Sequence, residues 1–166
     1  MNTLLYFSYG SNMSSKRLQA RVPSAKPVCI GILDEHSLRF HKRSHDGSAK
    51  CDAFETGNSA EKVIGVVFTI DEAEKPTLDR AEGLGNGYDI KQVNLHLPDG
   101  NRLSAFTYYA TDIDDSLLPY PWYKNHVLQG ALEHGLPSAY IEQIKAVQFV
   151  MDPDHKRHQR EIAIQT

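Results

Sequence analysis

Seven short stretches of apolar and β-favouring residues are spread along the chain, and most are bounded by glycine, proline or other turn-forming residues. Their length and alternation are typical of β-strands, which we expect at residues 4–7, 26–33, 37–42, 51–54, 62–70, 88–97 and 103–110. Residues 62–70 are apolar on both faces, which predicts a strand buried on both sides. Glycines interrupt two strands. We expect a bulge or bend at Gly31, and a bulge or a close backbone approach at Gly65.

Helical patterns are inserted between the strands and follow them. We expect helices at residues 14–21, from about 71 to 81, at 121–134 and at 138–147. Pro76 lies late for the first turn of a helix that starts at Asp71, so this helix starts later or kinks. From Asp152 the chain is charged, and we expect this tail to be flexible and frayed at its end. The order of elements predicts one α+β domain, 1–166, whose mixed or antiparallel sheet is curled or closed and flanked by helices.

Composition narrows the class of protein. The chain has 166 residues, of which 40% are hydrophobic and 23% charged, as in ordinary globular domains. A net charge of -3 argues against a nucleic-acid partner. Cys29 and Cys51 show neither metal-ligand spacing nor a disulfide framework, and no signal peptide or membrane span is evident. We therefore expect a cytoplasmic protein with no membrane partner.

The stretch from Tyr6 to Asn12 begins as a strand and breaks abruptly at Gly10. Glycine permits a positive φ or a close backbone approach, while Ser11 and Asn12 favour turns and helix caps. A strand that passes through such a turn into a short helix directs backbone N–H groups at one point, where they can bind an anion. The alternative interpretation is an ordinary strand-turn-helix corner.

One carboxylate has an unusual position. Glu82 closes a helical segment just before Gly83, where the helix macrodipole disfavours a negative charge. A carboxylate that is more easily protonated suits proton transfer near neutrality, although a surface glutamate closing a helix is the plain alternative. Phosphate-loop, dinucleotide-binding, zinc-protease and hydrolase-elbow motifs are absent. His155 and His158 lie in a charged tail, and His41 and His45 have no evident third ligand, so we expect no metal site.

Three separated motifs, in order, resemble those of the γ-glutamylcyclotransferase family. Residues 6–13 (Tyr-Phe-Ser-Tyr-Gly-Ser-Asn-Met) resemble its Tyr-Gly-Ser-Asn segment, and residues 78–83 with Gly87-Tyr88 resemble its Leu-Asp…Glu-Gly…Tyr segment. Tyr123-Lys124, Gly130-Ala131 and residues 133–140 are similar to its C-terminal helices. The resemblance covers about residues 5–147.

This resemblance implies a small β-barrel flanked by helices, and an enzyme of glutathione metabolism that cyclises a γ-glutamyl group to 5-oxoproline without a cofactor. It implies that Glu82 is the catalytic proton shuttle. It places the substrate-binding positions at Tyr9, Gly10, Ser11, Asn12, Tyr88 and Tyr123. For Tyr88 and Tyr123, core packing with a satisfied hydroxyl competes with direct substrate contact.

The leaving group stays open at this point. Lys50 and Asp52 stand where some relatives carry a small apolar run, so the released partner is an amino acid, a simple amine or a larger carrier. A non-catalytic relative that binds a ligand or a protein is the alternative of a different class, but it would not need Glu82. A homodimer is compatible with the sequence, which contains no signal that decides it.

Overall fold

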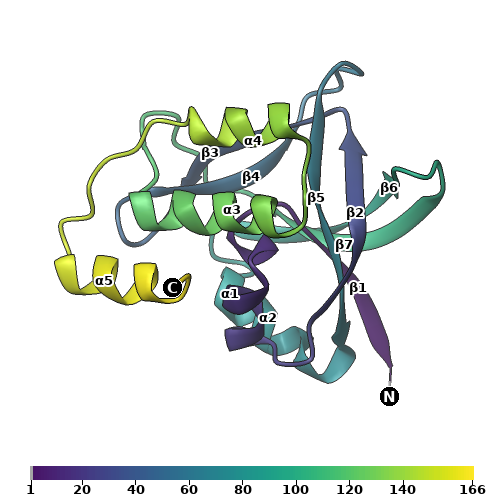
Figure 1. The fold of residues 1–166 in the computed structure, drawn as a ribbon, viewed down its shortest axis with the longest axis horizontal. Helices are drawn as coiled ribbons and strands as arrows, with labels where there is room; N and C mark the ends of the chain where they lie inside the picture. The colour runs from purple at the N-terminus through teal and green to yellow at the C-terminus, as the bar shows by residue number, and fades with distance from the viewer. Residues whose placement is uncertain (1) are drawn as a thin grey trace.

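The computed structural model describes residues 2–166, and each of the seven expected strands is present with ends that differ by one or two residues (Figure 1). The strands are β1 (Thr3–Ser8), β2 (Lys26–Asp34), β3 (His36–Arg43), β4 (Ala49–Glu55), β5 (Lys62–Asp71), β6 (Tyr88–His96) and β7 (Arg102–Ala110). The helices are α1 (Ser15–Arg21), α2 (Lys75–Glu82), α3 (Pro121–Glu133), α4 (Ser138–Lys145) and α5 (His155–Ala163), with short 3-10 helices η1 (Ser11–Met13) and η2 (Glu72–Glu74).

Five strands form a closed barrel in the order β1-β5-β2-β6-β7, while β3 and β4 make a separate two-stranded sheet. Neighbouring barrel strands are antiparallel except β1 and β7, which meet in parallel where Tyr6 lies opposite Phe106. Closure removes the free edges that an open sheet of this size would expose. The predicted small mixed barrel flanked by helices is therefore confirmed, and Figure 1 shows α1 and α2 side by side beneath α3.

Strand β5 pairs with β1 and β2 and is buried continuously from Val63 to Phe68, as its apolar residues on both faces predict. A methyl group added at Gly65 would collide with the carbonyl oxygen of Ser8, so the predicted close backbone approach is confirmed there. The bulge or bend predicted at Gly31 is wrong. Gly31 pairs directly with Gly65, and the irregularity in β2 lies between Pro27 and Cys29. Gly31 instead makes room for a packed side chain of β6.

The helices predicted from the sequence are present, and one helix, α5, was not predicted. Helix α2 starts later than Asp71, at Lys75, so that Pro76 falls in its first turn, where the missing N–H costs nothing. Helix α3 buries the predicted face through Tyr123 and Val127. The sequence did not predict α5, whose mostly polar residues form a helix capped by the Asp154 side chain.

Candidate active site

Two adjoining hollows lie where β1 leaves the barrel. The inner recess is walled mainly by tyrosines and by the turn after β1, and the outer basin, of about 350 Å³, opens beside it between α1, α2 and the β3–β4 hairpin. All seven site residues expected from the sequence line the inner recess: Tyr9, Gly10, Ser11, Asn12, Glu82, Tyr88 and Tyr123. Four of these residues, Ser11, Glu82, Tyr88 and Tyr123, also line the outer basin. A ligand that spans both hollows therefore passes Glu82.

The end of α2 places Glu82 at this boundary. Gly83 adopts a left-handed conformation (φ 76°) and terminates the helix, so the Glu82 side chain turns toward η1 rather than into solvent and is only 16% exposed. The amide nitrogen of Asn12 donates a hydrogen bond to Oε1 of Glu82, and Nη1 of Arg21 lies 3.4 Å from the same oxygen. Both contacts hold the Oε1 atom of the carboxylate in place at the boundary between the two hollows.

The turn after β1 is held by close packing rather than by a positive φ. Gly10 has φ -113°, and a methyl group there would lie 3.1 Å from Cβ of Cys51 and 3.4 Å from the Tyr123 hydroxyl. Ser11 and Asn12 then begin η1, whose first N–H groups have no acceptor within the turn. The turn thus lines the recess, while its Ser11 and Asn12 side chains bond Arg17 and Glu82.

The tyrosine hydroxyls are engaged with backbone. Tyr88 donates to the Cys51 carbonyl, and the Cys51 N–H donates to the Tyr123 hydroxyl at 2.9 Å. Tyr9 donates to the Tyr108 carbonyl at 2.5 Å. Burial raises the pKa of Tyr9, Tyr88 and Tyr123 well above 10, so all three are neutral. These contacts favour a structural role in which the hydroxyls are bonded to backbone and the rings line the recess. Four further residues that the sequence analysis did not select also line it: Tyr6, Ser8, Cys51 and Tyr108.

The outer basin has a chemistry that the sequence analysis missed. Its lining contains one carboxylate, Glu82, and five lysine and arginine side chains, Arg17, Arg21, Lys42, Lys50 and Arg80. These cations come from α1, β3, β4 and α2, so no local cluster marks them in the sequence. Lys50 and Asp52, whose roles the sequence left open, both belong to β4, and Lys50 lines the basin. Asp52 does not: it is buried, and it bonds Nε2 of His41 at 2.7 Å and the Ala110 N–H.

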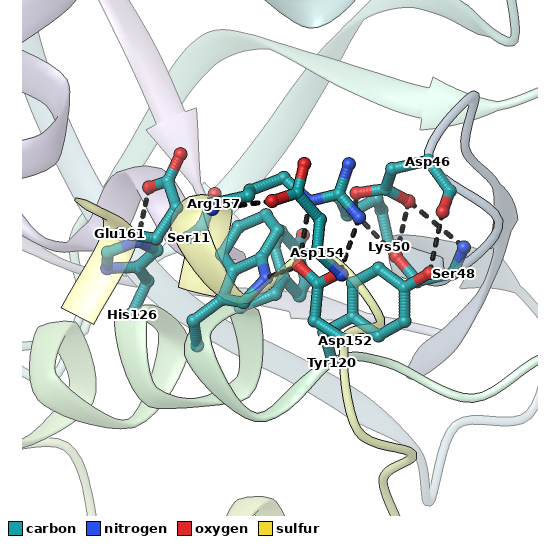
Figure 2. A network of polar contacts seen from close by, with 12 residues as sticks. Ser11, Asp46, Ser48, Lys50, Tyr120, His126, Asp152, Asp154, Arg157 and Glu161 are labelled. Atoms are coloured by element: carbon teal, nitrogen blue, oxygen red, sulfur yellow. Dashed lines mark hydrogen bonds and ion pairs between the residues drawn. The ribbon is translucent and has the colours of Figure 1, made fainter. Parts of the chain in front are cut away.

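Some of these cations are already paired. Figure 2 shows Lys50 held by Asp46 and Ser48, with Nζ 2.7 Å from each oxygen, and Glu161 of α5 bonded to His126. Glu161 also pairs with Nη1 of Arg17 at 3.0 Å, and Nε of Arg17 donates to Ser11. Helix α5 thus holds an arginine that supports the turn after β1.

Two features are absent from residues 2–166, the described part of the chain. No three histidine, cysteine or acidic side chains gather as metal ligands there. No helix in that part of the chain is both long and apolar enough to cross a membrane.

Comparisons with known proteins agree with this geometry. The AIG2-like family matches residues 62–144. The mouse and human proteins named gamma-glutamylcyclotransferase are each 32% identical over 154 residues, covering 88% of this chain and 79% of the relative. The chain belongs to the gamma-glutamylcyclotransferase family. A solved structure titled "Gamma-glutamyl cyclotransferase" superimposes with a TM-score of 0.87 at 28% identity, covering 98% of this chain and 99% of the other. The family and barrel expected from the three sequence motifs are therefore confirmed.

Proposed function

We propose that the protein cyclises γ-glutamyl compounds, releasing 5-oxoproline and the amine that was bound to the γ-carbonyl. The α-amine nitrogen attacks the γ-carbonyl carbon, a new C–N bond closes a five-membered ring, and the old amide C–N bond breaks. No external reactant is consumed. The observation that carries the proposal is that Glu82 and the turn after β1 line one recess and contact each other through Asn12. The named relatives support the same reaction class.

Glu82 is the proposed proton shuttle. A free α-amine with a pKa of about 8 is mostly an ammonium ion at neutral pH and cannot attack. The Glu82 carboxylate accepts a proton from this nitrogen and delivers one to the departing amine nitrogen, so the acid and base steps use one group. Asn12 and Arg21 fix one carboxylate oxygen, Oε1, which leaves Oε2 for the substrate. The reaction is intramolecular, so holding the γ-glutamyl group folded supplies much of the acceleration.

The turn after β1 is the proposed anion-binding element. Backbone N–H groups of Ser11 and Asn12 begin η1 and line the recess. Two anionic groups of the reaction suit such donors: the substrate α-carboxylate and the oxyanion that develops on the γ-carbonyl oxygen. Tyr9, Tyr88 and Tyr123 form the neutral walls that position the slender γ-glutamyl chain.

The test is 5-oxoproline release from a panel of γ-glutamyl dipeptides and γ-glutamylamines, measured for the wild-type protein and for Glu82→Gln. The variant keeps the size and hydrogen-bonding capacity of the side chain but cannot shuttle a proton. We expect it to stay folded and to lose about a hundredfold or more in kcat, the usual contribution of a general acid–base group. Glu142→Gln, an exposed substitution on α4, is the matched control and should retain full activity. Full activity of Glu82→Gln would refute the shuttle, and absence of product from every substrate would refute the enzyme.

A further inference from the structure

The outer basin carries positive charge that the protein does not neutralise. Three of its five cations have carboxylate partners: Arg17 pairs with Glu161, Arg21 with Glu82, and Lys50 with Asp46. The other two, Lys42 and Arg80, have no carboxylate within 4.0 Å among the described residues. Within residues 2–166, the side chain of Arg80 makes one hydrogen bond, to Thr77 on its own helix. Two cations therefore remain for a ligand.

Lys42 is the more informative of the two. It is only 6% exposed, it lines the basin, and no hydrogen-bond acceptor within the described chain contacts its ammonium group. Its Nζ lies 4.8 Å from the centre of the Tyr88 ring, and its stem lies so close to Gly87 that a methyl group there would be 2.7 Å from Cε. Burial lowers the pKa of Lys42. The side chain of Lys42 is thus largely buried, while its ammonium group lines the basin without a carboxylate partner among residues 2–166, and an anionic ligand would supply that partner.

The position of the basin decides which part of the substrate meets these charges. Lys42 and Arg80 line the basin but not the inner recess, whose only ionisable acid or base besides tyrosine and Cys51 is Glu82. If the γ-glutamyl group occupies the recess, as proposed above, the amide bond lies beside Glu82 and the leaving amine extends into the basin. Lys42 and Arg80 would therefore lie beside the leaving amine rather than beside the γ-glutamyl group.

We propose that the basin selects leaving amines that carry two carboxylates, as glutamate and aspartate do, and that Lys42 and Arg80 are its specificity-determining residues. An ordinary amino acid has one carboxylate and can pair with only one of these two cations, while a simple amine has no carboxylate and can pair with neither Lys42 nor Arg80. This inference rests on the proposed function, and it names the substrate class for it.

The experiment compares γ-glutamyl-glutamate with γ-glutamyl-glutamine, which have nearly the same shape and differ by one charge. In the wild-type protein we expect kcat/KM to be about tenfold higher for the acidic substrate, the size of one hydrogen bond to a charged group, mainly through KM. In a Lys42→Met, Arg80→Gln double variant this ratio should fall to about one. Methionine preserves the buried stem of Lys42, and Arg80→Gln alone changes an exposed side chain and gives a second variant that folds. Lys16→Met, an exposed lysine outside the basin, is the control and should keep the wild-type ratio.

A second readout does not depend on turnover. Free glutamate should inhibit the wild-type protein competitively at about tenfold lower concentration than glutamine, and the double variant should lose this difference. Equal kcat/KM for the two substrates in the wild type, or an unchanged ratio in both Arg80→Gln and the double variant, would overturn the inference while leaving the proposed cyclisation intact. Failure to form 5-oxoproline from any substrate would instead refute the proposed function.

Discussion

The substitution Gly130→Ala places two well-known effects in opposition. Gly130 lies within α3, and replacing a helical glycine with alanine normally stabilises a protein by about 0.5–1 kcal/mol. Here the added methyl group would lie 2.6 Å from the carbonyl carbon and Cβ of Met13, and 2.6 Å from the backbone nitrogen of Ser14. Optimal carbon–carbon contacts are about 3.5–4.0 Å, so the turn after β1 or α3 itself must move.

The magnitude follows from what the methyl group meets. Met13 and Ser14 are fully buried, and two of the three close atoms belong to the backbone, so no flexible side chain can swing aside. Overpacking of this kind costs about 1–3 kcal/mol, which exceeds the gain in helix propensity. We expect a net loss of about 1–2 kcal/mol in the free energy of unfolding, or about 2–8 °C in Tm for a chain of this size. Because η1 carries Asn12 to Glu82, kcat should fall as well, by about tenfold or more.

Thermal unfolding by calorimetry and 5-oxoproline release measure the two effects. Leu132→Ala is the control, since this side chain of α3 is 48% exposed and its loss should change the unfolding free energy by less than about 0.5 kcal/mol. A Gly130→Ala protein that unfolds at or above the wild-type temperature would refute the reasoning. It would mean that helix propensity dominates, and that the packing of α3 on η1 is loose.

Two further substitutions test contacts around the site. Hydrogen bonds from Arg157 hold the pKa of Asp152 well below its usual range, so the stability they provide is present above the unfolded pKa of about 3.9 and is lost as pH falls below it. In urea titrations, Asp152→Asn should therefore lose less unfolding free energy than the wild type between about pH 6 and pH 3, and an identical loss would contradict this. Tyr123→Phe leaves the buried N–H of Cys51 without its acceptor and should lower the unfolding free energy by about 1–3 kcal/mol, whereas Tyr109→Phe should change it little. A urea midpoint for Tyr123→Phe equal to that of Tyr109→Phe would show that this contact contributes nothing.

The sequence predicts well those features that depend on neighbours in the chain. Strand positions follow from local alternation, and the apolar run of β5 correctly indicates burial on both faces. The error at Gly31 has a different cause. Gly31 and Gly65 both interrupt strands, and at each an atom from another element leaves no room for a side chain: Leu95 of β6 at Gly31, where a bulge or bend was predicted, and the Ser8 carbonyl of β1 at Gly65, where the close approach was predicted. A single glycine in a strand predicts crowding or irregularity, and only the fold decides between them.

The inner recess and the outer basin of the candidate site also differ in whether neighbours in the chain or distant elements define them. The turn after β1 and Glu82 belong to short contiguous motifs, so the sequence marks them. The sequence does not mark the basin, because Lys42 and Arg80 have ordinary spacing among other polar residues. No local pattern shows that Lys42 becomes buried without a carboxylate partner among the described residues. Helix α5 was missed for a related reason: most of its residues are polar, and the pairing of Glu161 with Arg17 and His126, which joins it to the rest of the protein alongside the packing of Ile162, is between residues far apart in the sequence. This pairing also sets the charge of the basin, because without Glu161 a third cation, Arg17, would lack its carboxylate. The selectivity proposed for the leaving group therefore depends on a helix that contributes no residue to the lining of the basin.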